Sequence, residues 1–130
     1  MTTAVRWLSG ITMLLVLIQA VLIGQGLFLS DPARITLHGW IGNVTFVGVI
    51  VLTGLSVISV RRGELSRPAI GLSVLAALLT VAQIGLGYSG RGGGVPAALH
   101  IPNGVLIATL LAALLTVSFW PSSSAEQIRP

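Results

Sequence analysis

The sequence has very little charge: only 8% of its 130 residues are Asp, Glu, Lys or Arg, whereas an ordinary soluble domain is about one quarter charged. Hydrophobic residues make up 54% of the chain, and the mean hydropathy is +0.98. So few charged side chains could not cover the surface of a water-soluble globule of this size. The composition therefore argues strongly against a soluble enzyme, and the length allows one domain.

Cysteine and lysine are absent. Without cysteine there is no disulfide, no thiolate metal ligand, no covalent haem attachment through a C-x-x-C-H motif and no cysteine nucleophile. All seven basic residues are arginine, and they form neither the basic patch nor the basic helix face that binds nucleic acid. Nucleic acid is therefore not an expected partner.

The few charges are clustered, and four long segments between them carry none: residues 7–30, 35–60, 68–90 and 92–125. Each segment is longer than the about 20 residues that a membrane-spanning helix needs. We therefore expect an all-α integral membrane four-helix up-down bundle embedded in the lipid bilayer. It would form a single transmembrane domain over 1–130, with spans near 7–29, 36–60, 69–88 and 97–120 and a polar C-terminal tail at 121–130.

The first segment is expected to be a retained helix rather than a signal peptide. Its apolar stretch is long, and no A-x-A-type cleavage site precedes Asp31. Five arginines would share one side of the membrane (Arg6, Arg61, Arg62, Arg67 and Arg129) and two the other (Arg34 and Arg91). The positive-inside rule then predicts a multi-pass protein of the cell (inner) membrane with both termini cytoplasmic.

The chain has only two histidines, His38 and His100, and each follows an outer loop near the start of the second or the fourth helix. Titratable residues inside spans are rare and are functional candidates by default. The surroundings repeat: a Gly-x-Gly pair, a loop with one Arg and one Pro, a Leu-His pair, and a glycine four residues later. This pattern predicts two parallel two-helix repeats related by a pseudo-two-fold along the membrane normal.

Such symmetry puts His38 and His100 at one depth on diagonally opposed helices. Two imidazoles so placed can hold a planar metal macrocycle from both faces, which makes them the candidate iron ligands of one haem b. Other metals fit less well, because zinc generally needs four ligands, or three and a water. The sequence offers no cysteine and no carboxylate within a span.

Further candidate cofactor-binding residues surround the histidines. The glycines one turn after each histidine would leave room for the ring, or would serve close helix packing. The two outer arginines would pair with haem propionates, or would anchor the helices at the interface. Four polar residues are near enough to hydrogen-bond an imidazole or a propionate. These three sets are Gly42 and Gly104; Arg34 and Arg91; and Asn43, Asn103, Gln25 and Thr36.

Pro102 leaves two interpretations of the fourth helix open. The helix could start at Pro96, in which case Pro102 falls in its second turn and kinks it. It could instead start at Pro102, where proline is well tolerated, and His100 would then lie on an irregular entry segment.

The unit Gln83-Ile84-Gly85-Leu86-Gly87, followed by Leu99-His100, resembles the helix-pair unit of the haem A synthase family. Gln19, Gly24-Gln25-Gly26 and Leu37-His38 resemble it more loosely. That family carries four-helix halves with haem-ligating histidines on the second and fourth helices, so the resemblance covers one half. The family's catalytic Glu and Arg beside the first histidine are replaced here by Ile35 and Gly39. Haem oxidation, and enzymatic activity in general, is therefore not expected.

The two His-x-x-x-Gly units are more similar to a family of small four-helix bacterial membrane proteins of unknown function. They run over residues 38–43 and 100–104. The resemblance implies haem b binding without naming a reaction.

Two hypotheses follow from the sequence. The leading one is a b-type cytochrome-like protein that binds one haem between helices 2 and 4 by bis-His ligation. It would transfer electrons at the outer side to a quinone or a membrane redox partner, with haem storage or sensing as further options. The alternative is a cofactor-free membrane subunit or assembly factor of a larger complex, in which the two histidines hydrogen-bond across the bundle.

Overall fold

The computed structural model describes residues 1–120, which form four α-helices and, within that range, no strand. The helices are α1 (Thr2–Phe28), α2 (Pro32–Arg61), α3 (Pro68–Ser89) and α4 (Gly94–Val117), with a short 3-10 helix η1 (Gly90–Gly92) before α4. The all-α fold predicted from the sequence is confirmed. The predicted tail at 121–130, with Arg129, lies outside the described residues.

Proline and aspartate set the starts of the two middle helices. The Asp31 carboxylate accepts hydrogen bonds from two backbone N–H groups of the first turn of α2, which otherwise lack partners. Pro32 takes the first position of α2 and Pro68 that of α3, where a missing N–H costs nothing. The charge clusters of the sequence thus coincide with helix ends.

The fourth helix begins earlier than either interpretation of Pro102 proposed. Gly93 and Gly94 have φ angles of 83° and 77°, a region that glycine adopts readily, and they turn the chain into α4. The helix runs on through Pro102, which lies in its interior and cannot donate a backbone hydrogen bond there. His100 therefore lies on helix rather than on an irregular entry segment.

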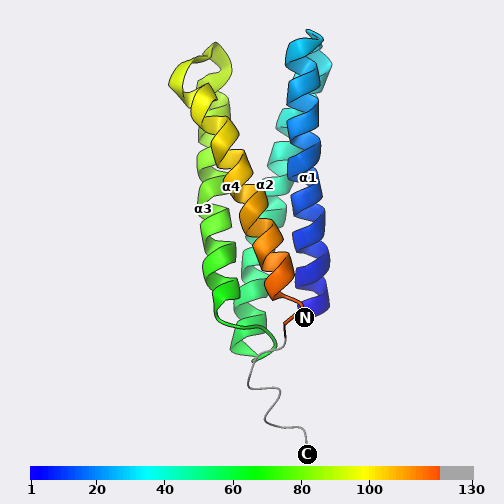
Figure 1. Ribbon diagram of the computed structural model, residues 1–130, viewed down its shortest axis with the longest axis vertical. Coiled ribbons are helices and arrows are strands. Elements are labelled where there is room, and N and C mark those ends of the chain that lie inside the picture. Colours follow the sequence, from blue (N-terminus) through cyan, green and yellow to red (C-terminus); the bar gives the residue numbers. More distant parts are fainter. Residues whose placement is uncertain (121–130) are drawn as a thin grey trace, which may run out of the picture.

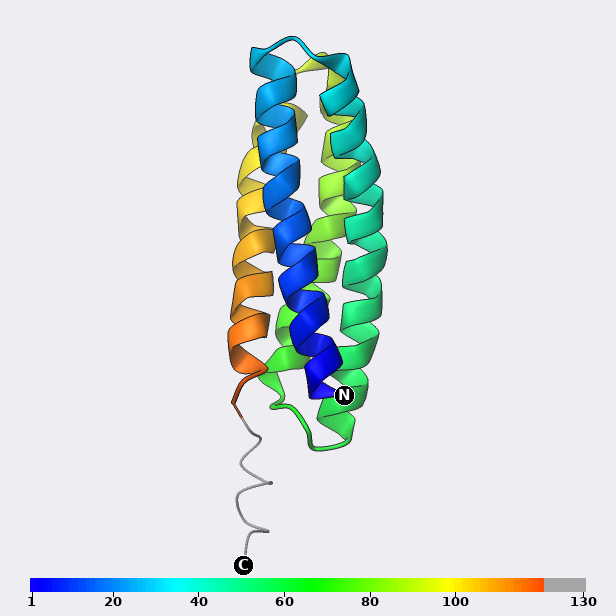
Figure 2. The same cartoon turned by 90° about the vertical axis from the view of Figure 1, so that its right-hand side faces the viewer.

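The helices form a ring of neighbours. Each packs against the helices next to it in sequence, and α4 also packs against α1. Among residues 1–120, the diagonal pairs α1–α3 and α2–α4 bring no Cα atoms within 8 Å of each other. The N-terminus and the α2–α3 connection lie at one end, called here the N-terminal end (Figure 1; Figure 2). The α1–α2 and α3–α4 connections lie at the other, the histidine end.

Packing is tight only toward the N-terminal end. The buried hydrophobic residues come from the first halves of α1 and α3, the second halves of α2 and α4, and the α2–α3 connection. They are Val5, Val49, Leu52, Leu65, Ala69, Ala76, Ile107, Leu111 and Leu114. Toward the histidine end the α1–α2 pair diverges from the α3–α4 pair (Figure 1). The two pairs are thus joined mainly by the N-terminal half of the bundle.

The outer surface of the bundle is apolar along its length. Phe28 is 91% exposed, Ile101 72% and Trp7 71%. All four helices are long and apolar enough to cross a membrane. In water such a surface would promote association, whereas in a bilayer lipid tails cover it. These helices indicate a multi-pass membrane protein.

Close packing between α1 and α2 depends on Gly48. A Cβ atom at this position would lie 2.7 Å from the Thr12 Cγ2 atom. Thr12 cannot easily turn away, because it is 1% exposed and its hydroxyl donates to the Leu8 carbonyl at 2.7 Å. We expect Gly48→Val to lower the free energy of unfolding by about 1–3 kcal/mol, the usual cost of overpacking. Unfolding in mixed detergent micelles, followed by circular dichroism, measures it.

Gly71→Val is the matched control, because a Cβ atom at Gly71 would meet nothing within 4 Å. It makes the same change of residue type on α3 and carries the same loss of side-chain freedom in a helix. Equal losses in the two variants would contradict the packing role of Gly48.

Candidate functional site

The structure brings His38 and His100 together. Each is the seventh residue of its helix, on α2 and α4 respectively. Although these two helices make no backbone contact, the imidazole ring centroids lie 5.9 Å apart with an angle of 64° between the ring planes. Both side chains are half-buried. Two residues that lie 62 positions apart in the sequence thus meet across the diagonal of the bundle.

One hydrogen bond sets the orientation of each ring. The Nδ1 atom of His38 lies 3.0 Å from the Gln19 carbonyl oxygen on α1, and the Nδ1 atom of His100 lies 3.1 Å from the Gln83 carbonyl oxygen on α3. A carbonyl oxygen only accepts, so each Nδ1 carries the proton and donates it. A neutral imidazole has one ring proton, which leaves Nε2 with its lone pair in both rings. A bond of this kind is also what orients metal-binding histidines in proteins.

The side chains of the same two glutamines are held in turn. The Gln19 Nε2 atom donates to the Thr45 hydroxyl at 2.9 Å, and the Gln83 Oε1 atom accepts from the Asn103 Nδ2 atom at 2.6 Å. Asn103 also donates to the Leu79 carbonyl at 2.9 Å. These bonds tie α1 to α2 and α3 to α4 close to each histidine.

The glycines four residues after each histidine accommodate these glutamines. A Cβ atom at Gly42 would lie 3.1 Å from the Gln19 Oε1 atom, and one at Gly104 would lie 3.1 Å from the Gln83 Nε2 atom. The immediate neighbour of each glycine is therefore an amide of its own helix pair. Cofactor contact at Gly42 and Gly104 stays a prediction.

Gly87 makes room for an imidazole. A Cβ atom there would lie 3.1 Å from the His100 Cε1 atom, whereas one at Gly85, a few residues earlier on α3, would meet nothing within 4 Å. The two glycines of this Gly-x-Gly pair thus differ in role. The corresponding position in the first half, Gly26, packs against Ile35 instead.

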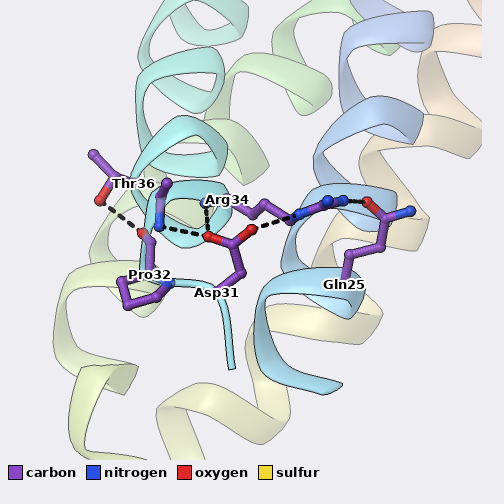
Figure 3. Close-up of polar contacts among 6 residues, drawn as sticks. Gln25, Asp31, Pro32, Arg34 and Thr36 are labelled. Carbon is purple, nitrogen blue, oxygen red and sulfur yellow. Dashed lines mark hydrogen bonds and ion pairs between the residues drawn. The ribbon is translucent and has the colours of Figure 1, made fainter. Parts of the chain in front are cut away.

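Arg34 belongs to a polar network at the start of α2 (Figure 3). Its Nε atom donates to the Asp31 Oδ2 atom at 2.8 Å, and its Nη1 atom donates to the Gln25 side-chain oxygen on α1. The Thr36 hydroxyl donates to the Pro32 carbonyl within the same turn. Of the candidate partners of the imidazoles or propionates, Gln25 thus joins α1 to α2 through Arg34, and Thr36 bonds within α2.

Arg91 has a different environment. Its guanidinium carbon lies 4.8 Å from the centroid of the Tyr88 ring, a cation–π arrangement. Both outer arginines are thus at the histidine end, as the sequence predicted. Whether either binds a propionate stays a prediction.

None of the four polar residues that the sequence offered as partners of an imidazole or a propionate is the partner of an imidazole Nδ1 atom. The main-chain carbonyls of Gln19 and Gln83 were missed, although these glutamines are among the few amides in the charge-free segments. Asn103 does not bond an imidazole but donates to the side chain of Gln83, whose main-chain carbonyl bonds His100. Asn43 makes no side-chain hydrogen bond with any part of the chain from 1 to 120. The sequence did contain a signal for these partners: each glutamine is a polar residue inside a span, on the helix that precedes its histidine helix.

Titratable ligands beyond the two histidines are not gathered anywhere in residues 1–120: no group of three or more His, Cys, Asp or Glu side chains could hold a metal ion there. The donor set of this site is two imidazoles. That set suits a metal whose remaining positions are filled by its own macrocycle.

No model of a known protein family, no curated protein and no solved structure matches the chain. The resemblance to the haem A synthase family and to the small four-helix proteins stays a prediction. The assignment of a function therefore rests on the geometry of the chain itself.

The Asp31–Arg34 pair predicts a pH dependence of stability. The hydrogen bond from the Arg34 side chain lowers the pKa of Asp31 below its ordinary value. The carboxylate therefore contributes stability above the pKa of the unfolded chain and loses it as the pH falls through the lower, folded pKa. We expect the melting temperature to fall below about pH 4, and to fall less in Asp31→Asn.

Asparagine caps a helix about as well as aspartate, so this variant keeps the cap and removes only the charge. Glu64, whose pKa is lowered by the N-terminal ammonium group, titrates in both proteins and cancels in the difference. Parallel melting curves against pH would show that the Asp31–Arg34 pair adds nothing.

Proposed function

We propose that this chain is a small integral membrane b-type haem protein that binds one haem through His38 and His100 and transfers electrons. The proposal includes an up-down bundle of two parallel two-helix repeats. A single observation carries it: two half-buried imidazoles face each other from diagonal helices, with each Nδ1 atom engaged by the main chain. Each Nε2 lone pair is then left for a metal.

The spacing of the rings supports this proposal. Imidazole nitrogens bind first-row metals at about 2.0–2.1 Å, so two imidazoles on opposite sides of one ion have centroids roughly 6 Å apart. In the structure the centroids of the His38 and His100 rings lie 5.9 Å apart. The angle of 64° between the planes is compatible, because each ring can rotate about its metal–nitrogen bond.

The remaining candidate residues have supporting roles. The Nδ1–H donors make the imidazoles more basic ligands and keep them in one tautomer. Arg34 and Arg91 lie at the same end and supply positive charge for two propionates. Arg34 would pair with a propionate and with Asp31 at the same time. A haem with both axial positions filled by protein supplies a one-electron iron couple, which favours electron transfer over oxygen chemistry.

The proposed location is the cell (inner) membrane, with both termini cytoplasmic. The basic residues near the N-terminal end, Arg6, Arg61, Arg62 and Arg67, support this orientation by the positive-inside rule. The histidines would then lie toward the outer side. A quinone or a membrane redox partner would exchange electrons there.

The alternative is a cofactor-free subunit or assembly factor of a larger complex. One observation favours it: the two rings lie edge to face with their centroids 5.9 Å apart, an arrangement that itself stabilises packing. In that case the Nε2 atoms bind no metal. The two proposals then differ in the visible absorption of the purified protein, which only haem would give.

We expect the protein, purified in mild detergent from cells supplied with haem, to show a Soret band and the sharp visible bands of low-spin haem after dithionite. His38→Ala and His100→Ala should each abolish the low-spin bands, because each removes one of two axial ligands. Absorption spectra before and after reduction measure the effect. Thr109→Val, an outward-facing change on α4, is the control that should keep the spectrum.

A colourless protein that nevertheless elutes as a folded species on size exclusion would contradict haem binding and leave the cofactor-free alternative. Low-spin spectra retained in either histidine variant would show that the ligands are misassigned.

The two glycines of the α3 pair offer a sharper test. Gly87→Ala adds a methyl group 3.1 Å from the His100 ring and should displace it by a few tenths of an ångström. We expect weaker low-spin bands and faster haem loss to apomyoglobin. Gly85→Ala adds the same methyl group where nothing lies within 4 Å, and should behave as the parent. Identical haem loss from both variants would count against ligation by His100.

A further inference from the structure

Asn43 is a polar residue on the outside of the bundle. It lies on α2 five residues after His38, and at 100° per residue this places it on the side of the helix that faces away from the histidine. Its side chain is exposed and, within residues 1–120, has no hydrogen-bond partner. Asn43 lies nine positions after Arg34, toward the interior of the candidate span, so in a bilayer lipid tails rather than water would surround it.

The surface beside Asn43 is apolar. Trp40, Asn43, Val44 and Val47, all on α2, line an open depression of about 310 Å³ whose surface is almost wholly apolar. Trp40 is 67% exposed and Val47 60%.

The exposed face continues along α2 with a helix-pairing spacing. Trp40, Asn43, Val47, Ile50 and Gly54 follow one another at intervals of 3, 4, 3 and 4 residues, and all are exposed. This is the a/d pattern of a left-handed helix pair, in which a lone polar residue sets the register. A face with this spacing fits another helix better than it fits a small molecule.

The Asn43 amide indicates which helix would pack against this face of α2. An unpaired amide in hydrocarbon has no water to satisfy it. An amide carries both donors and an acceptor, so two copies related by a two-fold axis satisfy each other reciprocally. Copies inserted in the same direction have that axis along the membrane normal, which brings Asn43 to Asn43 at one depth.

We propose that this face of α2 is a homodimer interface, in which a second copy of the chain packs its α2 against the first through the Asn43 amides and the flanking apolar residues. The equivalent face of α4 lacks this property. At the offset that relates the two histidines, Val105 corresponds to Asn43 and Thr109 to Val47. The Thr109 hydroxyl already donates to the Val105 carbonyl.

The absence of cysteine makes the test direct. Val47→Cys places a single thiol in the centre of the proposed interface, where facing Cα atoms come within the short range that a disulfide needs. We expect a disulfide-linked dimer of the full chain when native membranes are oxidised. Thr109→Cys, at the corresponding outward position of α4, should stay monomeric on a non-reducing gel.

The amide is tested separately. We expect Asn43→Val to weaken dimerisation of the purified chain in lipid vesicles by about 3- to 30-fold, the range measured for hydrogen bonds between membrane helices. Thr109→Val should leave it unchanged. Förster transfer between labelled copies at increasing lipid dilution measures both.

Two outcomes would overturn the interface. One is equal cross-linking through Val47→Cys and Thr109→Cys, which indicates random collision. The other is dimerisation that Asn43→Val does not weaken. Either result is independent of haem, so it leaves the proposal on His38 and His100 untouched.

Discussion

The hydrogen bond from each imidazole Nδ1 to a main-chain carbonyl is the interaction on which the site depends. It chooses the tautomer, turns Nε2 away from its own helix pair and fixes each ring relative to a second helix. The acceptors, the carbonyls of Gln19 and Gln83, lie inside helices and keep a second lone pair after their helical bond. Because the acceptor is backbone, no side-chain substitution at these positions deletes it.

The two helix pairs reach the same arrangement with different residues. The first uses Thr45, seven residues after its histidine, to hold the glutamine amide, and the second uses Asn103, three residues after. One contact goes to the amide nitrogen and the other to the oxygen. An amide offers both a donor and an acceptor, so either chemistry can immobilise it. Each helix pair therefore holds its glutamine amide through a different residue and a different atom.

Much of the fold could be predicted from the sequence. Charge placement gave the four helices to within a few residues, because hydrocarbon excludes charge so strongly. The sequence also predicted that His38 and His100 lie at one depth on opposed helices, and the structure brings their rings together. The start of α4 did not follow, because Pro102 suggests a boundary that the surrounding helix overrides.

The rotation of the helices was beyond sequence reasoning. Asn43 and Asn103 look alike as neighbours of a histidine, yet Asn103 is buried against Gln83 and Asn43 faces outward. Most positions of these helices are apolar, and their polar side chains lie both inside, as at Ser56 and Ser73, and outside, as at Thr109. Polarity therefore does not show which side packs inward. Which side of each helix packs inward depends on contacts such as that between Gly48 and Thr12, which only the structure reveals.

Buried apolar contact is concentrated at the N-terminal end, so the two ends of the bundle differ in how strongly their helices are held together. Segments with few buried contacts open at lower free energy than a packed core. The α1–α2 and α3–α4 pairs are joined mainly through Val49, Leu52, Leu111 and their neighbours. His38 and His100 lie on different pairs, at the other end of the bundle. A ligand that bound both histidines would therefore join the pairs at a second place and would add its binding free energy to the cost of separating them.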